Sequence, residues 1–226
     1  MQRYNIFNQI HKGLRTMLYD TAMSLQHTVF MNTDEANQTL SKVEEAIHLF
    51  HSHAEHEDMF VLPAVEKHAA SLVNEFASEH ETDEQLSVSL RSLIASYNLA
   101  SDSEARTAAG YAITMAFNEF IAFNLYHMNK EEDKINKVLW KHYTDGELVA
   151  ITQAIIASIP PEDMAIETDW MIKGLNNYEI INWLSAVKND APDFVFKSLL
   201  SQAEAVLPEQ RWNEIKEGLM EGAMMA

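Results

Sequence analysis

Residues 51–60, HSHAEHEDMF, combine three histidines with three acidic residues. On a helical wheel with about 100° per residue, His53 and Glu57 lie about 40° apart, on the side that also carries apolar residues. The opposite side carries the members expected to face water: His51, Glu55 and Asp58. An imidazole or carboxylate on an apolar stripe must be paired, neutralised or bound to a cation, because burying it alone costs several kcal/mol.

The same spacing recurs later in the segment HMNKEED, where His127 and Glu131 are again four residues apart. They share a face with a row of large apolar residues: Ile113, Phe120, Phe123 and Val138. Near the start of the chain, His11 lies in line with apolar residues such as Leu14 and Leu18. His80 lies roughly 80° from the centre of its own apolar stripe, so it is the least well directed of these residues.

Apolar residues spaced three and four apart predict four long helices that position these residues, at 3–30, 34–67, 69–98 and 102–142. Asn32 and Ser101 are the expected N-caps, each followed by a glutamate three residues later. Pro63 predicts a kink or an early end of the second helix. Four long helices with short connections favour an all-α, up-down antiparallel bundle, which can hold metals in its core.

The depth of each residue in such a bundle can be compared by counting from the turns. His11 and His53 each lie about 21 residues from a first turn near residue 32. The pair His53/Glu57 and His80 lie about 12 to 13 residues from a second turn near residue 68. Across the third turn the pair His127/Glu131 is about seven residues deeper than His80, a mismatch of roughly 10 Å. The shared face and depth favour a metal site over ordinary core histidines.

The other histidines do not gather at one level and are interpreted as ordinary surface or core residues: His27, His48, His51, His68 and His142. His56 lies at the border of the inward face and, like Glu84, is left open as a further ligand.

After residue 143 the sequence changes to short helical pieces. A capping box, TDGE, at 144–147 is followed by helix-ending residues: Pro160–Pro161, Gly174, Asn176–Asn177, Pro192 and Pro208. The chain is therefore predicted to comprise a bundle over 1–143 and a smaller region of short helices over 144–226. The composition of the second region is typical of a packed cap or a homo-oligomer surface rather than a catalytic domain.

The amino-acid composition limits the classes of partner and of metal ligand that can be expected. The chain has 34 acidic against 16 basic residues, and its formal charge of −18 would repel nucleic acid and anionic membrane surfaces. With no cysteine, any metal must be held by histidine and carboxylate. Neither a signal peptide nor an apolar run of about 20 residues is present, so a cytoplasmic protein is expected.

Four segments, in this order, resemble the helix motifs of the hemerythrin-like (HHE cation-binding) family: IHKGLR, HAEHEDMFVLPAVE, EHETDEQL and HMNKEED. The resemblance implies a four-helix bundle with a non-haem di-iron centre that binds O2 or related small molecules. It implies two iron ions, with manganese or zinc as alternatives, on a set of six ligands: His11, His53, Glu57, His80, His127 and Glu131.

The chain departs from the oxygen-carrying members of that family. They have two histidines on the third helix, where only His80 is found, and their last carboxylate follows its histidine by five residues rather than four. Asp83 also occupies a position that is usually apolar in the family. At least one more coordination position than in the carriers should therefore be open. Water, Glu84, His56 or a tyrosine could fill it.

The leading hypothesis is a di-iron protein that binds, senses or scavenges O2, NO or peroxide rather than a turnover enzyme. A di-iron oxidase or peroxidase is the first alternative. Enzymes of the ferritin type need two Glu-x-x-His motifs, and the sequence offers only EAIH at 45–48. A helical interaction or iron-storage protein is the remaining alternative.

Overall fold

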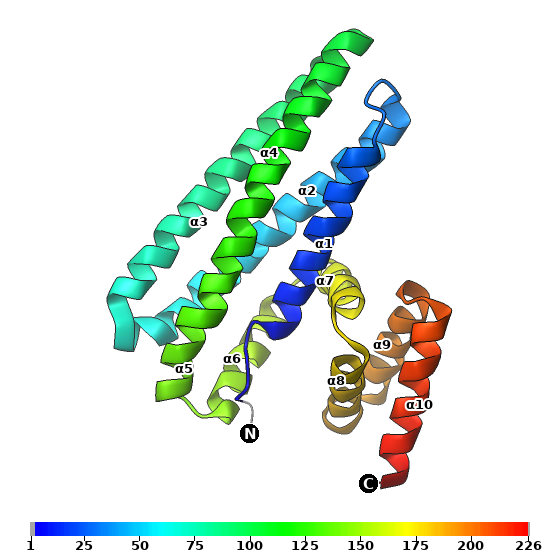
Figure 1. Ribbon diagram of the computed structural model, residues 1–226. Coiled ribbons are helices and arrows are strands. Elements are labelled where there is room, and N and C mark those ends of the chain that lie inside the picture. The colour runs from blue at the N-terminus through cyan, green and yellow to red at the C-terminus, as the bar shows by residue number, and fades with distance from the viewer. Residues whose placement is uncertain (1–2, 226) are drawn as a thin grey trace.

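The computed structural model describes the backbone of residues 3–225, and within that range every regular element is a helix. Four helical segments run alternately up and down as the predicted bundle (Figure 1). The first is α1 and the second is α2 extended through a π-helical turn. Their bounds are α1 Asn8–His27, α2 Thr33–His56 and the π-turn η1 Glu57–Val61.

The second segment continues into α3 (Leu62–Leu99) and ends at a kink at Ala69, from which the third segment runs to Leu99. The fourth segment again contains a π-helical turn. Its parts are α4 Ser103–Lys130, η2 Glu131–Ile135 and α5 Asn136–His142. The break at Ala69 lies two residues after the predicted end of the second helix, and helical structure runs through Pro63.

Two of the predicted helix starts differ from the structure. Asn32 caps α2 as predicted, accepting a hydrogen bond from the backbone N–H of Glu35. The cap of α4, however, is Asp102 rather than Ser101. The first helix starts at Asn8 and not at residue 3, because the preceding arm is held against α5: Arg3 donates to the carbonyl oxygens of Trp140 and Tyr143.

The two π-turns change which residues face the core. The N–H of the residue after each turn bonds to the carbonyl five residues earlier, Leu62 to Glu57 and Asn136 to Glu131. Each turn thus holds one extra residue. Val138, predicted to share the inward face of its helix, is only partly buried and packs at the edge of the core. In each helix, the fully buried residues at and after the end of the turn lie one position later in the sequence than regular α-helical spacing would place them. They are Val61, Val65, Ile135 and Leu139.

The second part of the chain consists of short helices, as predicted. They are α6 Asp145–Ser158, α7 Pro161–Gly174, α8 Asn177–Asp190, α9 Asp193–Val206 and α10 Glu209–Met225. Each break falls at a predicted helix-ending residue, and Thr144 with Glu147 forms the predicted capping box. No helix among residues 3–225 is long and apolar enough to cross a membrane.

These short helices are packed onto the bundle at two places. Leu148 of α6 shares a core cluster with Phe7 and Val61. Helix α7 lies against α1 so closely that a Cβ on Gly13 would lie 2.9 Å from the backbone nitrogen of Met171. Helices α8 to α10 enclose a core of their own with the end of α7. The division of the chain at residue 143 stays a prediction.

Candidate metal centre

The six side chains predicted to bind metal converge at one end of the bundle. They form two groups, His11, His53, Glu57 and Glu131 in one, and Glu57, His80, His127 and Glu131 in the other. In each group the four ligand atoms lie within 4.8 Å of one another. Both glutamates belong to both groups, so the two groups form one centre with shared carboxylates.

The first group joins α1, α2, η1 and η2. The Nε2 atoms of His11 and His53 are 3.1 Å apart. The Nε2 atom of His53 lies 3.2 Å from a carboxylate oxygen of Glu57, and that of His11 lies 3.4 Å from an oxygen of Glu131. Two imidazole nitrogens at this distance, both facing carboxylates, are arranged to share a cation.

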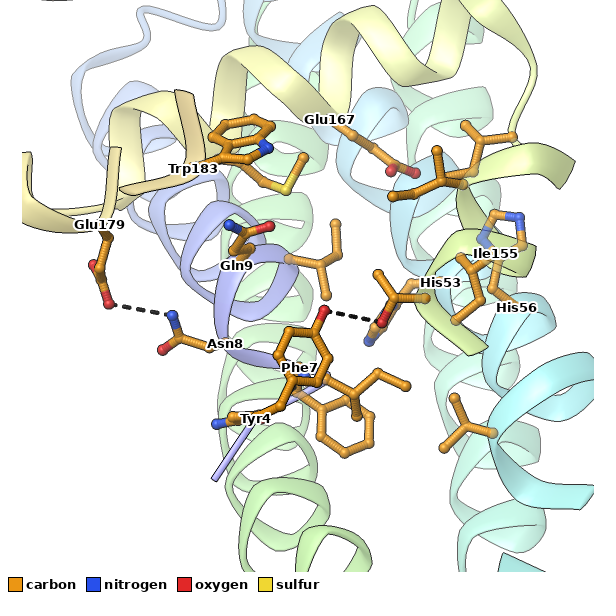
Figure 2. A pocket seen from close by; sticks show the side chains of 18 of the residues that line it. Tyr4, Phe7, Asn8, Gln9, His53, His56, Ile155, Glu167, Glu179 and Trp183 are labelled. Atoms are coloured by element: carbon orange, nitrogen blue, oxygen red, sulfur yellow. Dashed lines mark hydrogen bonds between the residues drawn. The ribbon is translucent and has the colours of Figure 1, made fainter. Parts of the chain in front are cut away.

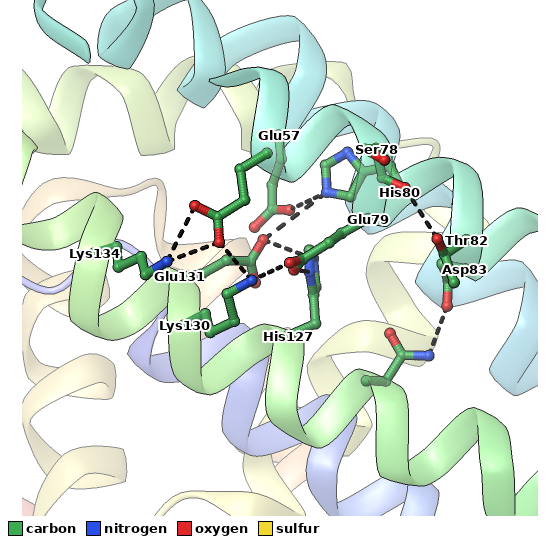
Figure 3. Close-up of polar contacts among 12 residues, drawn as sticks. Glu57, Ser78, Glu79, His80, Thr82, Asp83, His127, Lys130, Glu131 and Lys134 are labelled. Atoms are coloured by element: carbon green, nitrogen blue, oxygen red, sulfur yellow. Dashed lines mark hydrogen bonds and ion pairs between the residues drawn. The ribbon is translucent and has the colours of Figure 1, made fainter. Parts of the chain in front are cut away.

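The second group joins η1, α3, α4 and η2 (Figure 3). The Nε2 atom of His127 lies 2.9 Å from an oxygen of Glu131, and the Nε2 atom of His80 lies 3.3 Å from an oxygen of Glu57. Glu57 and Glu131 are 2% and 0% exposed, which makes them the most deeply buried acids of the site.

His80 points into this centre, although it is the least buried of the six residues, as its position on the helical wheel suggested. Its side chain is only 8% exposed. Side chains on a helix lean toward the N-terminus. Because α3 and α4 are antiparallel, His80 and His127 lean toward each other along the bundle axis, which reduces the expected depth mismatch. Their ring centroids are 5.2 Å apart.

Three of the four histidines also bind an outer carboxylate through Nδ1. His11 pairs with Glu132 at 3.0 Å, His80 with Asp58 at 2.8 Å and His127 with Glu79 at 2.8 Å. A carboxylate at Nδ1 fixes the tautomer and leaves the Nε2 lone pair facing the centre. The role of these acids was not predicted from the sequence, although each is adjacent to a predicted ligand: Asp58 to Glu57, Glu79 to His80 and Glu132 to Glu131.

Without a bound cation, the carboxylates stabilise protonated histidines. Burial opposes the charged form of His80, but the carboxylates of Glu131 and Glu57 raise its pKa to about 11. Burial likewise opposes protonation of His127, and the charge of Glu131 raises its pKa to about 9. The hydrogen bond from His11 lowers the pKa of Glu132 to about 2.

The metal-free protein should therefore lose stability as the solution becomes alkaline. Because the pKa of His127 is raised from 6.5 to about 9, its contribution is complete below pH 6.5 and disappears as the pH rises through 9. We expect the free energy of unfolding to fall by roughly 2 to 3 kcal/mol between pH 7 and pH 10 from this residue. Urea titrations of the metal-free protein at both pH values test this. His127→Gln should remove that part of the fall, and an equal fall in the variant would contradict the assignment.

The buried polar atoms of the centre fit a cation. All four carboxylate oxygens of Glu57 and Glu131, together with Nε2 of His80, are enclosed without a hydrogen-bond partner among the described residues. Such atoms are costly to bury unless something else satisfies them. Bonds of roughly 2.0–2.2 Å from a metal to histidine nitrogen and carboxylate oxygen place two ligand atoms up to about 4.4 Å apart. The two limits are similar, since the ligand atoms of each group lie within 4.8 Å of one another.

Three residues considered in the sequence analysis take other positions. Glu84 is at the surface beside His51 and does not reach the centre. Asp83 is buried and accepts a hydrogen bond from the side chain of Asn124. His56 is half-buried and lines a cavity beside the centre.

That cavity has a volume of about 500 Å³ and lies between the N-terminal arm, α1, η1 and helices α6 to α8 (Figure 2). His53 and Glu57 form part of its wall, next to apolar residues of the second region such as Ile155 and Met164. The side of the centre that carries His53 and Glu57 therefore faces this cavity. Helices after residue 143 form part of the cavity wall.

Comparison with known proteins identifies one family. A family model for the hemerythrin HHE cation-binding domain matches residues 3–139. No curated protein and no solved structure gives a significant match. The matched range contains all six residues of the centre and ends before α6.

Proposed function

The chain belongs to the hemerythrin HHE cation-binding family, and we propose that it holds two iron ions and binds, senses or scavenges O2, NO or peroxide. The observation that carries the proposal is the pair of four-residue groups that share Glu57 and Glu131. Carboxylates common to two groups are suited to bridging two cations. Apart from the ion pairs with the histidines of the two groups, their oxygens have no hydrogen-bond partner among the described residues.

The ligand atoms fit iron. Imidazole suits iron and zinc, whereas sites of magnesium or calcium use oxygen alone. Four imidazole nitrogens and four carboxylate oxygens give the chain eight donor atoms, against about twelve positions on two octahedral ions. Iron bound here would supply reducing electrons and open coordination positions for a small ligand. Manganese and zinc remain alternatives that metal analysis can distinguish.

The chain itself fixes the ligands and restricts access of water. The outer carboxylates hold three imidazole rings in one orientation. Phe7 stacks on His11 with ring centroids 4.9 Å apart, and Phe123 stacks on His127 at 5.9 Å. A rigid, apolar surround of this kind limits solvent access and proton transfer at a metal centre.

The function is tested by adding NO anaerobically to protein loaded with ferrous iron. We expect a change in the visible spectrum that saturates at about one NO per pair of ions, since the chain leaves only a few coordination positions open. His53→Ala should abolish the change, because it removes a ligand atom from the first group. His51→Ala is the matched control: it lies on the same helix, exposed and outside both groups. An iron-loaded sample that responds to neither NO nor O2 would contradict the proposal.

A di-iron oxidase or peroxidase is the second candidate, and the cavity beside His53 and Glu57 is the observation that favours it. Its volume of about 500 Å³ is within the range of small-molecule sites. Sustained consumption of O2 or peroxide in the presence of an electron donor, over many turnovers, would support this alternative. Binding without turnover would support the first proposal.

A further inference from the structure

The carboxylates at Nδ1 of the histidines are arranged in a similar way in the two halves of the bundle. Three of the four histidines have such a carboxylate, and the fourth does not. His11 binds the acid after Glu131, and His80 binds the acid after Glu57. His127 binds Glu79, the residue immediately before His80. The equivalent partner of His53 would be the residue immediately before His11, which is Ile10.

His53 is consequently the exception among the four histidines. Its Nε2 atom faces His11 and Glu57, as the ligand role requires. Its Nδ1 atom makes no hydrogen bond to any described residue, and the ring lines the cavity together with Ile10. A histidine that binds a metal almost always donates its other N–H to an acceptor. An acceptor is therefore lacking on the cavity side of His53.

The same cavity contains a carboxylate without a donor. Glu167 of α7 is 6% exposed and has no hydrogen-bond or ion-pair partner among the described residues, whereas nearby Asp163 is paired with His48. Burial raises the pKa of Glu167 to about 7, and the charge of His53 acts in the opposite direction. Figure 2 shows Glu167 and His53 projecting from different helices into this cavity.

We propose that a water molecule in the cavity accepts the Nδ1–H of His53 and donates to Glu167, so that α7 supplies the fourth outer carboxylate. Direct contact is absent, and a cavity of about 500 Å³ easily holds water. Two polar groups, each lacking a partner, give the water the minimum of two hydrogen bonds that an ordered buried water needs. The inference rests on the proposed metal centre, and it makes Glu167 a positioning residue outside the family's matched range.

The test compares metal affinity in four variants of the full chain, using zinc with a competing chelator. Glu167→Gln should weaken binding of one ion about tenfold, the lower end for loss of an outer partner. Glu167→Asp keeps the charge and should restore most of the affinity. Glu132→Gln removes a direct contact to His11 and should weaken binding at least as much. Glu162→Gln, exposed on the same helix, is the matched control and should bind as wild type.

Two further readouts separate positioning from a general structural effect. In zinc-loaded protein, nitrogen-resolved NMR should show slowly exchanging imidazole N–H signals, one of which exchanges faster in Glu167→Gln and a different one in Glu132→Gln. The unfolding midpoint of the metal-free Glu167→Gln protein should not fall, because the substitution removes a buried carboxylate that has no partner.

The outcomes are distinguishable. Unchanged affinity and unchanged N–H signals in Glu167→Gln, with normal metal content, would overturn this inference and leave the proposed function standing. Loss of one whole ion would overturn it too, since Glu167 would then be a direct ligand. Failure of the wild-type protein to bind any metal would overturn both proposals.

Discussion

Replacing Glu131 by glutamine is expected to reduce the bound metal from about two ions per chain to well below one. The reason is that Glu131 belongs to both groups, so one substitution weakens both cation sites. The substitution also removes a negative charge, so the positive charge of a cation in this buried site is less well neutralised. Elemental analysis of freshly purified protein, together with iron titration of metal-free protein, measures the effect.

The chain offers a close control for this experiment. Asp133 lies two residues after Glu131 on the same π-turn, but its side chain is 64% exposed and pairs with Lys137. Asp133→Asn should retain the full metal content. Far-UV circular dichroism of both metal-free variants shows whether the helices are intact. If Glu131→Gln, with its helices intact, retained both ions, Glu131 would not be a shared ligand.

Loading the metal-free protein with metal is expected to raise its unfolding midpoint by about 15 to 30 °C. A ligand at a thousand times its dissociation constant stabilises the folded state by about 4 kcal/mol, so two ions give about 8 kcal/mol. In a chain of 150–250 residues, each kcal/mol shifts the midpoint by about 2 to 4 °C. The physical source is the set of enclosed oxygens on Glu57 and Glu131, which a cation would satisfy.

Calorimetry of one preparation with and without an excess of ferrous iron tests this expectation. In the metal-free protein, protonated His80 and His127 partly balance the negative charge of the buried carboxylates. Protons therefore compete with the metal, and the rise in unfolding midpoint should be larger at pH 8.5 than at pH 6.5. Glu131→Gln should show only a small shift. A midpoint that does not move, in protein shown to contain both ions, would mean that the metal does not select the folded state.

The helices could be predicted well because their signals are local. The apolar spacing of three and four residues, the Asn32 cap and the Thr144 capping box act within one or two turns. The start of α1 could not be predicted, because Arg3 and Tyr4 are held by contacts with Trp140, more than 130 residues away. Such contacts leave no periodic trace in the sequence.

The candidate site was predictable to the extent that its residues lie on regular helices or at the start of a π-turn. His53 with Glu57 and His127 with Glu131 could be paired because four residues bring them to one face. The position of His80 was less predictable, since the helix tilt and the lean of its side chain are properties of the packed bundle. The position of Glu167 beside the site could not be predicted, because no residue spacing in the sequence indicates that α7 packs on α1.

The two π-turns have a consequence for how this sequence can vary. Each begins at a glutamate that belongs to both groups, Glu57 or Glu131, and the buried residues that follow lie eight and twelve positions after His53 or His127. Deleting one residue within 57–61 would restore an ordinary α-helix and rotate everything beyond it by about 100°. The ligands before the turn and the core residues after it would then require different helix orientations. Insertions and deletions, which loops usually tolerate, should therefore disrupt the site or the core when they fall inside these two helices. Substitutions alone would not reveal this constraint.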